Sequence, residues 1–133
     1  MLKQILLIRH AESEEDADPQ VRNQFPEKRI SITKEGRNQV RFLTRKLLSR
    51  LVKNQKVRLY TSQSRRVLET VNLFMSAFPH IKFDVREEER IRNLNWGSVN
   101  ERTIKEVEKE RYRVGVLYFQ FPDGDDTREF VRN

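Results

Sequence analysis

An arginine and a histidine stand side by side at the end of a short apolar run near the start of the chain. Arg9 and His10 follow the apolar residues 5–8, and an acidic segment comes after them. A guanidinium offers a rigid fork of donors that matches phosphate oxygens, and an imidazole nitrogen can attack phosphorus. The pair predicts a phosphate site or, as the plainer alternative, the solvated end of a strand.

A second arginine stands in a comparable position. The apolar residues 57–60 end in Thr61 and Ser62, and Arg66 opens the helix that follows. If both apolar runs are parallel neighbouring strands, their carboxyl ends meet at the rim of the sheet where ligands bind in open α/β folds. Arg66 would there hold a phosphate together with Arg9, assisted by N–H groups at the helix N-terminus. The alternative for Arg66 is an ordinary surface arginine in a first helical turn.

The elements that would position these residues alternate along the chain. Apolar periodicity predicts strands at residues 4–8, 57–60 and 81–85, and helices at 34–52, 64–78, 100–113 and from 126 onward. Thr33 is the expected N-cap of the first helix, and residues 9–32 are expected to form a polar loop. This order is typical of a parallel α/β sheet with right-handed crossovers, here as a single domain over residues 1–133.

The composition excludes several classes of protein. The chain of 133 residues has no cysteine, which excludes disulfides and thiolate metal sites and favours a reducing compartment. Its two histidines, His10 and His80, are too few and too far apart to suggest a zinc site. No apolar run approaches the roughly 20 residues of a membrane span, and the first residues lack a signal-peptide cleavage site. We therefore expect a cytoplasmic protein without a metal or other cofactor.

The net charge of +7 raises the question of a nucleic-acid partner. Many of the basic residues, however, lie on the helix expected at 34–52, where Lys34, Arg37, Arg41 and Arg45 recur on a face away from the apolar stripe. Such a pattern is typical of a solvated helix face. No aromatic stacking motif interleaves with it. Nucleic acid is therefore not the expected partner, whereas anionic small substrates fit the charge.

Five segments, in order along the chain, resemble the motifs of one family. They are Ile8-Arg9-His10-Ala11-Glu12-Ser13, residues 30–40, residues 60–70, residues 87–97 and Phe121-Pro122-Asp123-Gly124-Asp125. Over nearly its whole length the chain resembles the histidine phosphatase superfamily, and three of its four glycines fall on motif glycines. An Arg-Ile-Arg run before an aromatic–glycine pair favours the phosphoglycerate-mutase-like branch.

The resemblance implies a three-layer α/β sandwich with a mostly parallel sheet and a two-step phosphoryl transfer. His10 would carry a phosphohistidine, while Arg9 and Arg66 would hold the phosphate oxygens. The further binding positions that it implies are Glu12, Ser13 and Asn93. Glu12 would orient the loop or lie solvated in a turn, and Thr70 would pack or bind backbone. The expected ligand is a phosphorylated small molecule or a phosphoprotein, with a phosphate or sulfate ion as the simplest occupant.

Two departures from the family pattern weaken the expected chemistry. Asn93 stands where the family has its proton-donating glutamate, and an amide cannot donate that proton at neutral pH. Glu87, Glu88 and Glu89 are close by but are typical of a solvated acidic run. The second histidine of the family's site would follow Asn133, together with a strand and a helix.

The sequence therefore predicts a phosphate-ester hydrolase that works through a phosphohistidine at His10 and is weak or inactive. The alternative is a non-catalytic domain that binds a phosphorylated ligand or partner. A strand at residues 4–8 without its neighbour would have an unpaired apolar edge, so we expect a fragment of a longer protein or self-association through that edge.

Overall fold

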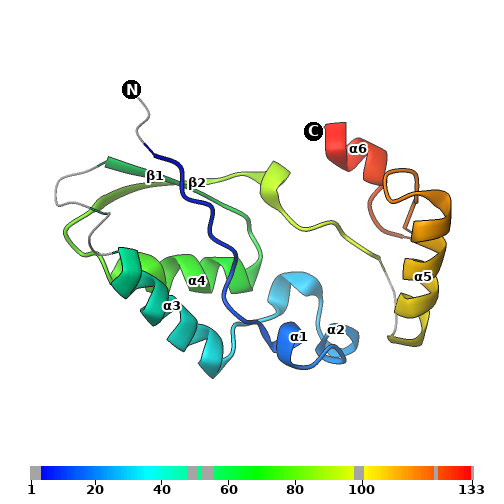
Figure 1. The fold of residues 1–133 in the computed structure, drawn as a ribbon, viewed down its shortest axis with the longest axis horizontal. Coiled ribbons are helices and arrows are strands. Elements are labelled where there is room, and N and C mark those ends of the chain that lie inside the picture. The colour runs from blue at the N-terminus through cyan, green and yellow to red at the C-terminus, as the bar shows by residue number, and fades with distance from the viewer. Residues whose placement is uncertain (1–3, 48–50, 52–55, 98–100, 122, 133) are drawn as a thin grey trace.

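A computed structural model describes residues 4–47, 51, 56–97, 101–121 and 123–132 (Figure 1). The elements in chain order are α1 (Glu14–Ala17), α2 (Val21–Gln24), η1 (Glu27–Arg29), α3 (Lys34–Leu47), β1 (Lys56–Thr61), α4 (Arg65–Ser76), β2 (Lys82–Glu87), η2 (Glu89–Ile91), α5 (Glu101–Val114) and α6 (Thr127–Arg132). Every helix among these residues falls short of the length and apolarity that a membrane crossing requires.

The sheet of the described residues consists of β1 and β2, which pair in parallel. The register sets Val57 opposite Phe83 and Leu59 opposite Val85. α4 connects the two strands, as expected for a crossover between parallel neighbours. Figure 1 shows α3 and α4 together on one face of the sheet, so the described residues form two of the three expected layers. The α/β class and the parallel pairing are confirmed.

The main core lies between this sheet and the helices α3 and α4. Its buried members are Ala11, Ile32, Val40, Leu47, Phe74 and Phe78. The Phe74 ring lies 5.1 Å from that of Phe78 and 6.1 Å from that of Phe83, measured between centroids. Such tilted and edge-to-face contacts add to the apolar burial that holds α4 against the sheet.

A second, smaller core lies under α5. Val107, Phe119 and Phe121 are buried there, and Trp96 packs against them with its ring centroid 5.0 Å from that of Phe121. Figure 1 shows α5 and α6 beside the sheet, joined to β2 through η2 and an extended segment. A Cβ on Gly124 would lie 2.5 Å from the backbone oxygen of Asn95 in this segment, so only glycine allows these two parts of the backbone to approach so closely.

The strand predicted at residues 4–8 is not formed. The segment is extended and Leu6 packs against the main core, but Ile5 and Leu7 are 70% and 96% exposed. Ile8 is also exposed, and within the described residues the segment makes none of the backbone hydrogen bonds that would place it in the sheet. Apolar residues alone do not form a strand, because strand pairing needs a neighbour with free backbone groups.

The segment predicted as a polar loop holds α1, α2 and η1. Ser13 caps α1, because its hydroxyl accepts from the Asp16 N–H at 3.2 Å while the Asp16 carboxylate accepts from the Ser13 N–H at 2.8 Å. This is a capping box with aspartate in place of glutamate.

The other boundaries differ less from the prediction. Thr33 is confirmed as a cap, since its hydroxyl accepts from the Gly36 N–H at 2.9 Å. The helix expected to reach residue 52 ends earlier, because Leu51 already lies in a bend, while residues 48–50 and 52 lie outside the described part. The helices expected at 64–78 and 100–113 and the strands at 57–60 and 81–85 all form within two residues of the predicted ends, residue 100 again being outside the described part.

Candidate functional site

The loop after the extended N-terminal segment presents His10 with a defined hydrogen-bonding state. The Nδ1 atom of His10 lies 2.8 Å from the carbonyl oxygen of Ala11, and the imidazole is 13% exposed. Because a carbonyl only accepts, Nδ1 carries the proton in this contact. A neutral imidazole with its proton on Nδ1 has its lone pair on Nε2, which is the state of a nucleophile.

Thr70 ties the His10 loop to the first turn of α4. The Ala11 N–H donates to the Thr70 hydroxyl at 3.1 Å, and that hydroxyl donates to the Arg66 carbonyl at 2.7 Å. Both hydrogen bonds are buried, which makes their loss costly. The expectation that Thr70 binds backbone is confirmed, and the contact places the loop of His10 against the helix that carries Arg66.

Glu12 fixes the other side of the same loop. Its carboxylate accepts from the Thr33 hydroxyl at 2.6 Å, and its carbonyl accepts from the Thr33 N–H at 2.9 Å. The start of α3 packs so closely that a Cβ on Gly36 would lie 2.3 Å from the Glu12 carbonyl oxygen. Of the two alternatives for Glu12, the structure supports the one in which it orients the loop.

Asp16 binds several polar groups on the exposed side of the loop. Its Oδ1 accepts from Arg9 at 3.1 Å, and its Oδ2 accepts from the Ser13 hydroxyl at 2.7 Å and lies 4.0 Å from Nδ1 of His10. Burial acts to raise the pKa of Asp16, but the Ser13 hydrogen bonds and the positive Arg9 outweigh it, and the pKa lies below its usual value. The Arg9 side chain is 78% exposed and can still turn toward a ligand. The Ser13 hydroxyl is instead occupied by its hydrogen bonds to Asp16 at the N-cap of α1.

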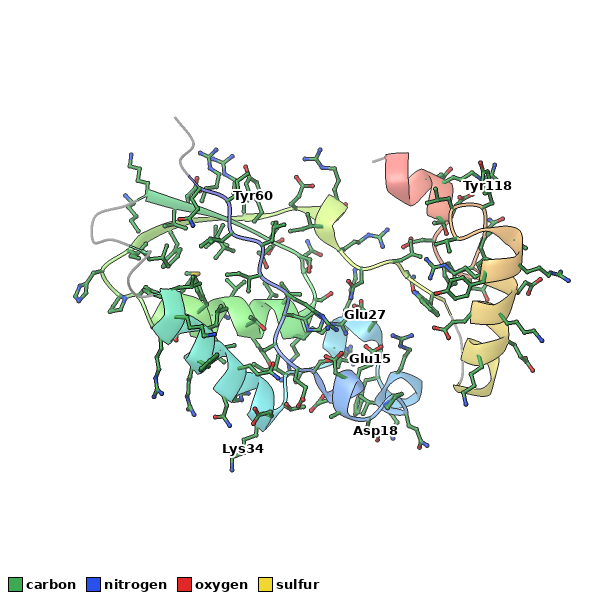
Figure 2. The ribbon with its side chains drawn as sticks, in the orientation of Figure 1. Glu15, Asp18, Glu27, Lys34, Tyr60 and Tyr118 are labelled. Carbon is green, nitrogen blue, oxygen red and sulfur yellow. The ribbon has the colours of Figure 1, made fainter. Side chains whose placement is uncertain are left out.

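Arg66 is a buried ion-pair partner, and the surface alternative for it is wrong. Its side chain is 3% exposed. One terminal nitrogen donates to Glu15 of α1 at 3.0 Å and the other donates to Glu27 of η1, while its Nε has no hydrogen-bond partner among the described residues. Figure 2 shows Glu15 and Glu27 close together between α1 and η1. A buried charge needs such partners, because leaving it unpaired costs several kcal/mol, about 3–5 in measured cases.

Asn93 meets the same cluster from the segment after η2. Its Nδ2 lies 3.4 Å from Oε1 of Glu27, and the Ser64 hydroxyl lies 3.5 Å from that oxygen. The structure therefore brings Asn93 and Arg66 to the same carboxylate, that of Glu27, which the sequence did not single out.

The cluster extends toward the second core through Arg22. This side chain donates to Glu15 and lies over the ring of Trp96, 5.5 Å from its centroid. Arg111 of α5 lies over the same ring at 5.6 Å. Burial, reinforced by the nearby charge of Arg66, lowers the pKa of Arg22. Cation–π contacts of this kind contribute roughly 0.5–2 kcal/mol each and hold α5 near the site.

Four residues of this cluster were not identified as site residues from the sequence. They are Glu15, Asp16, Arg22 and Glu27. The Ser-x-x-Asp spacing at 13–16 was a usable sign of a helix start, and hence of Asp16 as a cap partner. The ion pairs of Arg66 span 51 and 39 positions and leave no local pattern.

Comparison with known proteins adds an independent view of the chain. The family model of the histidine phosphatase superfamily (branch 1) matches residues 5–131. Two proteins of Arabidopsis thaliana, described as phosphoglycerate mutase-like protein AT74H and phosphoglycerate mutase-like protein AT74, are 29% and 30% identical over 96% of this chain. The matches cover 49% and 42% of those proteins, so the chain spans about half the length of these curated relatives.

Two solved structures share the fold. A candidate alpha-ribazole-5'-P phosphatase from Escherichia coli superposes with a TM-score of 0.67 and 17% identity, covering 94% of this chain and 60% of its own. The product of open reading frame Rv3214 from Mycobacterium tuberculosis superposes with a TM-score of 0.59 and 18% identity, covering 90% and 56%.

Proposed function

Because the chain belongs to the histidine phosphatase superfamily, we propose that it binds phosphate esters between His10 and Arg66 and that His10 accepts the phosphoryl group. The observation that carries this proposal is the Nδ1 contact of His10, which leaves Nε2 as the nucleophilic atom. The Thr70 bridge supports it, because it fixes this loop against the helix of Arg66.

The proposed reaction has two steps. In the first, Nε2 of His10 forms a bond to phosphorus as the ester P–O bond breaks, and the leaving oxygen takes a proton. In the second, water attacks the phosphohistidine, the N–P bond breaks and inorganic phosphate leaves. Arg9 and Arg66 would neutralise the charge on the phosphate oxygens in both steps, which is the main contribution of a protein to phosphoryl transfer.

The proposed substrate class is a phosphorylated small molecule or a phosphoprotein. The names of the relatives, a phosphoglycerate mutase-like protein and a phosphatase of a ribazole phosphate, both concern phosphate esters. Turnover by this chain is expected to be slow, because Asn93 offers an amide where an acid is needed and because Arg66 already holds two carboxylates.

Hydrolysis of p-nitrophenyl phosphate at mildly acidic pH tests the proposal. The unsubstituted protein should release p-nitrophenol slowly and retain an acid-labile phosphate after quenching, and His10→Ala should do neither. His80→Ala, a change of the same type at an exposed position after α4, is the matched control and should keep the activity. Turnover that His10→Ala leaves unchanged would refute the enzyme proposal.

A second candidate is a non-catalytic domain that holds a phosphorylated ligand or partner. The amide at Asn93 favours it, since a site without an acid can bind phosphate but protonates a leaving group poorly. Calorimetric titration with inorganic phosphate separates the two. Binding that Arg66→Met abolishes, in a protein with no His10-dependent turnover, would support the binding domain.

A further inference from the structure

The proposed reaction lacks a proton donor at the expected place. Transfer of the phosphoryl group to His10 leaves an oxygen anion on the alcohol, and an alkyl oxygen departs slowly unless it is protonated. Asn93 cannot supply that proton, because its amide does not ionise at accessible pH. The nearest carboxylates around Arg66 in the described residues are Glu15 and Glu27.

We propose that Glu27 is the catalytic acid and base of this site, in the role that Asn93 cannot fill; the inference rests on the phosphatase function proposed above. Oε1 of Glu27 accepts from Arg66 and lies 3.4 Å from Nδ2 of Asn93 and 3.5 Å from the Ser64 hydroxyl. Two separate segments of the chain, the start of α4 and the stretch after η2, thus meet at one carboxylate oxygen of Glu27, which lies within hydrogen-bond reach of position 93.

Glu15 shares Arg66 but is a poorer candidate. Its two oxygens are bound by two arginines, Oε1 by Arg22 and Oε2 by Arg66, and its side chain is 14% exposed. The Glu27 side chain is 33% exposed, so a leaving alcohol or a water molecule can reach it. Glu15 therefore serves to hold Arg66, and Glu27 is accessible for proton transfer.

Binding of a phosphate ester would change the surroundings of Glu27. The ester oxygens compete for the guanidinium of Arg66, since both carboxylate and phosphate accept from its fork of donors. A carboxylate that has lost its arginine and lies beside a phosphate dianion favours its protonated form. In the first step Glu27 gives its proton to the leaving oxygen as the P–O bond breaks. In the second it takes a proton from the water whose oxygen bonds to phosphorus as the N–P bond to His10 breaks.

The test compares two esters that differ in their need for an acid. p-Nitrophenolate leaves as a stable anion, whereas the alkoxide of glycerol phosphate must be protonated. Glu27→Gln should lower kcat for glycerol phosphate about 100-fold or more and for p-nitrophenyl phosphate less than about tenfold. Glu15→Gln is the matched control, because it removes a carboxylate from the same arginine without changing the contact to Asn93. It should affect both esters to a similar degree.

A second substitution separates a catalytic role from a structural one. Asn93→Glu in the Glu27→Gln protein introduces a carboxylate at the residue whose amide lies 3.4 Å from Oε1 of Glu27, and it should restore turnover of glycerol phosphate. Equal losses on both esters in Glu27→Gln, or an ester-selective loss in Glu15→Gln, overturn the inference while leaving the role of His10 intact. Absence of His10-dependent turnover of either ester in the unsubstituted protein overturns the proposed function and this inference together.

Discussion

Replacing Thr70 by valine should uncouple the His10 loop from α4. Valine keeps the branched shape of threonine but removes the hydroxyl that joins the Ala11 N–H to the Arg66 carbonyl. The Arg66 carbonyl keeps its helical partner, whereas the Ala11 N–H is left buried without an acceptor. A buried unsatisfied group costs about 1–3 kcal/mol. For a chain of this length that corresponds to a fall in Tm of roughly 4–12 °C.

Thermal unfolding followed by circular dichroism measures this loss. Thr70→Ser is the control, because it keeps the hydroxyl and removes only a methyl group. Since Ala11 directly follows His10, turnover of p-nitrophenyl phosphate should fall further in Thr70→Val than in Thr70→Ser at a temperature where both are folded. If the two variants unfold at the same temperature, the hydroxyl bridge contributes nothing and the reasoning about the loop is wrong.

The remaining predictions concern the contacts that frame the site. Gly36→Ala should destabilise the protein by about 1–3 kcal/mol despite the higher helix propensity of alanine, because its Cβ would lie 2.3 Å from the Glu12 carbonyl oxygen. Urea unfolding against Asn38→Ala, an exposed change in the same helix, checks this, and equal midpoints would exclude the clash. Hydrogen bonds from Arg92 hold the pKa of Asp125 below its usual value, so its stabilisation is present above the ordinary pKa of about 4 and is lost as the pH falls through the lowered value. The Tm of Asp125→Asn should therefore fall less between pH 6 and pH 3 than that of the unsubstituted protein. Asp125→Asn should also lose about 1–2 kcal/mol of stability at neutral pH. If Tm depends on pH in the same way in both proteins, the Arg92–Asp125 pair does not contribute to acid sensitivity.

The local features of the fold could be read from the sequence because they depend on near neighbours. Apolar spacing gave α3, α4 and both strands of the sheet, and Thr33 marked a helix start through its own hydroxyl. The strand expected at residues 4–8 does not form, because its formation does not depend on near neighbours alone. Its residues are apolar, but both the pairing and the burial of a strand depend on which backbone lies beside it, and that is not a property of the run.

In the candidate site, too, some features followed from the sequence and others only from the tertiary structure. The sequence by itself determined the chemistry that is available, namely a histidine that could act as a nucleophile at position 10, two arginines suited to phosphate, and an amide at Asn93 where an acid is expected. Only the tertiary structure decided how these groups are used. Arg66 is buried between Glu15 and Glu27. Its ion pair with Glu27 joins residues that are 39 positions apart in the sequence. Charges pair according to how the chain folds back on itself, because a buried guanidinium takes whichever carboxylates the packing brings to it, and no local spacing encodes that choice.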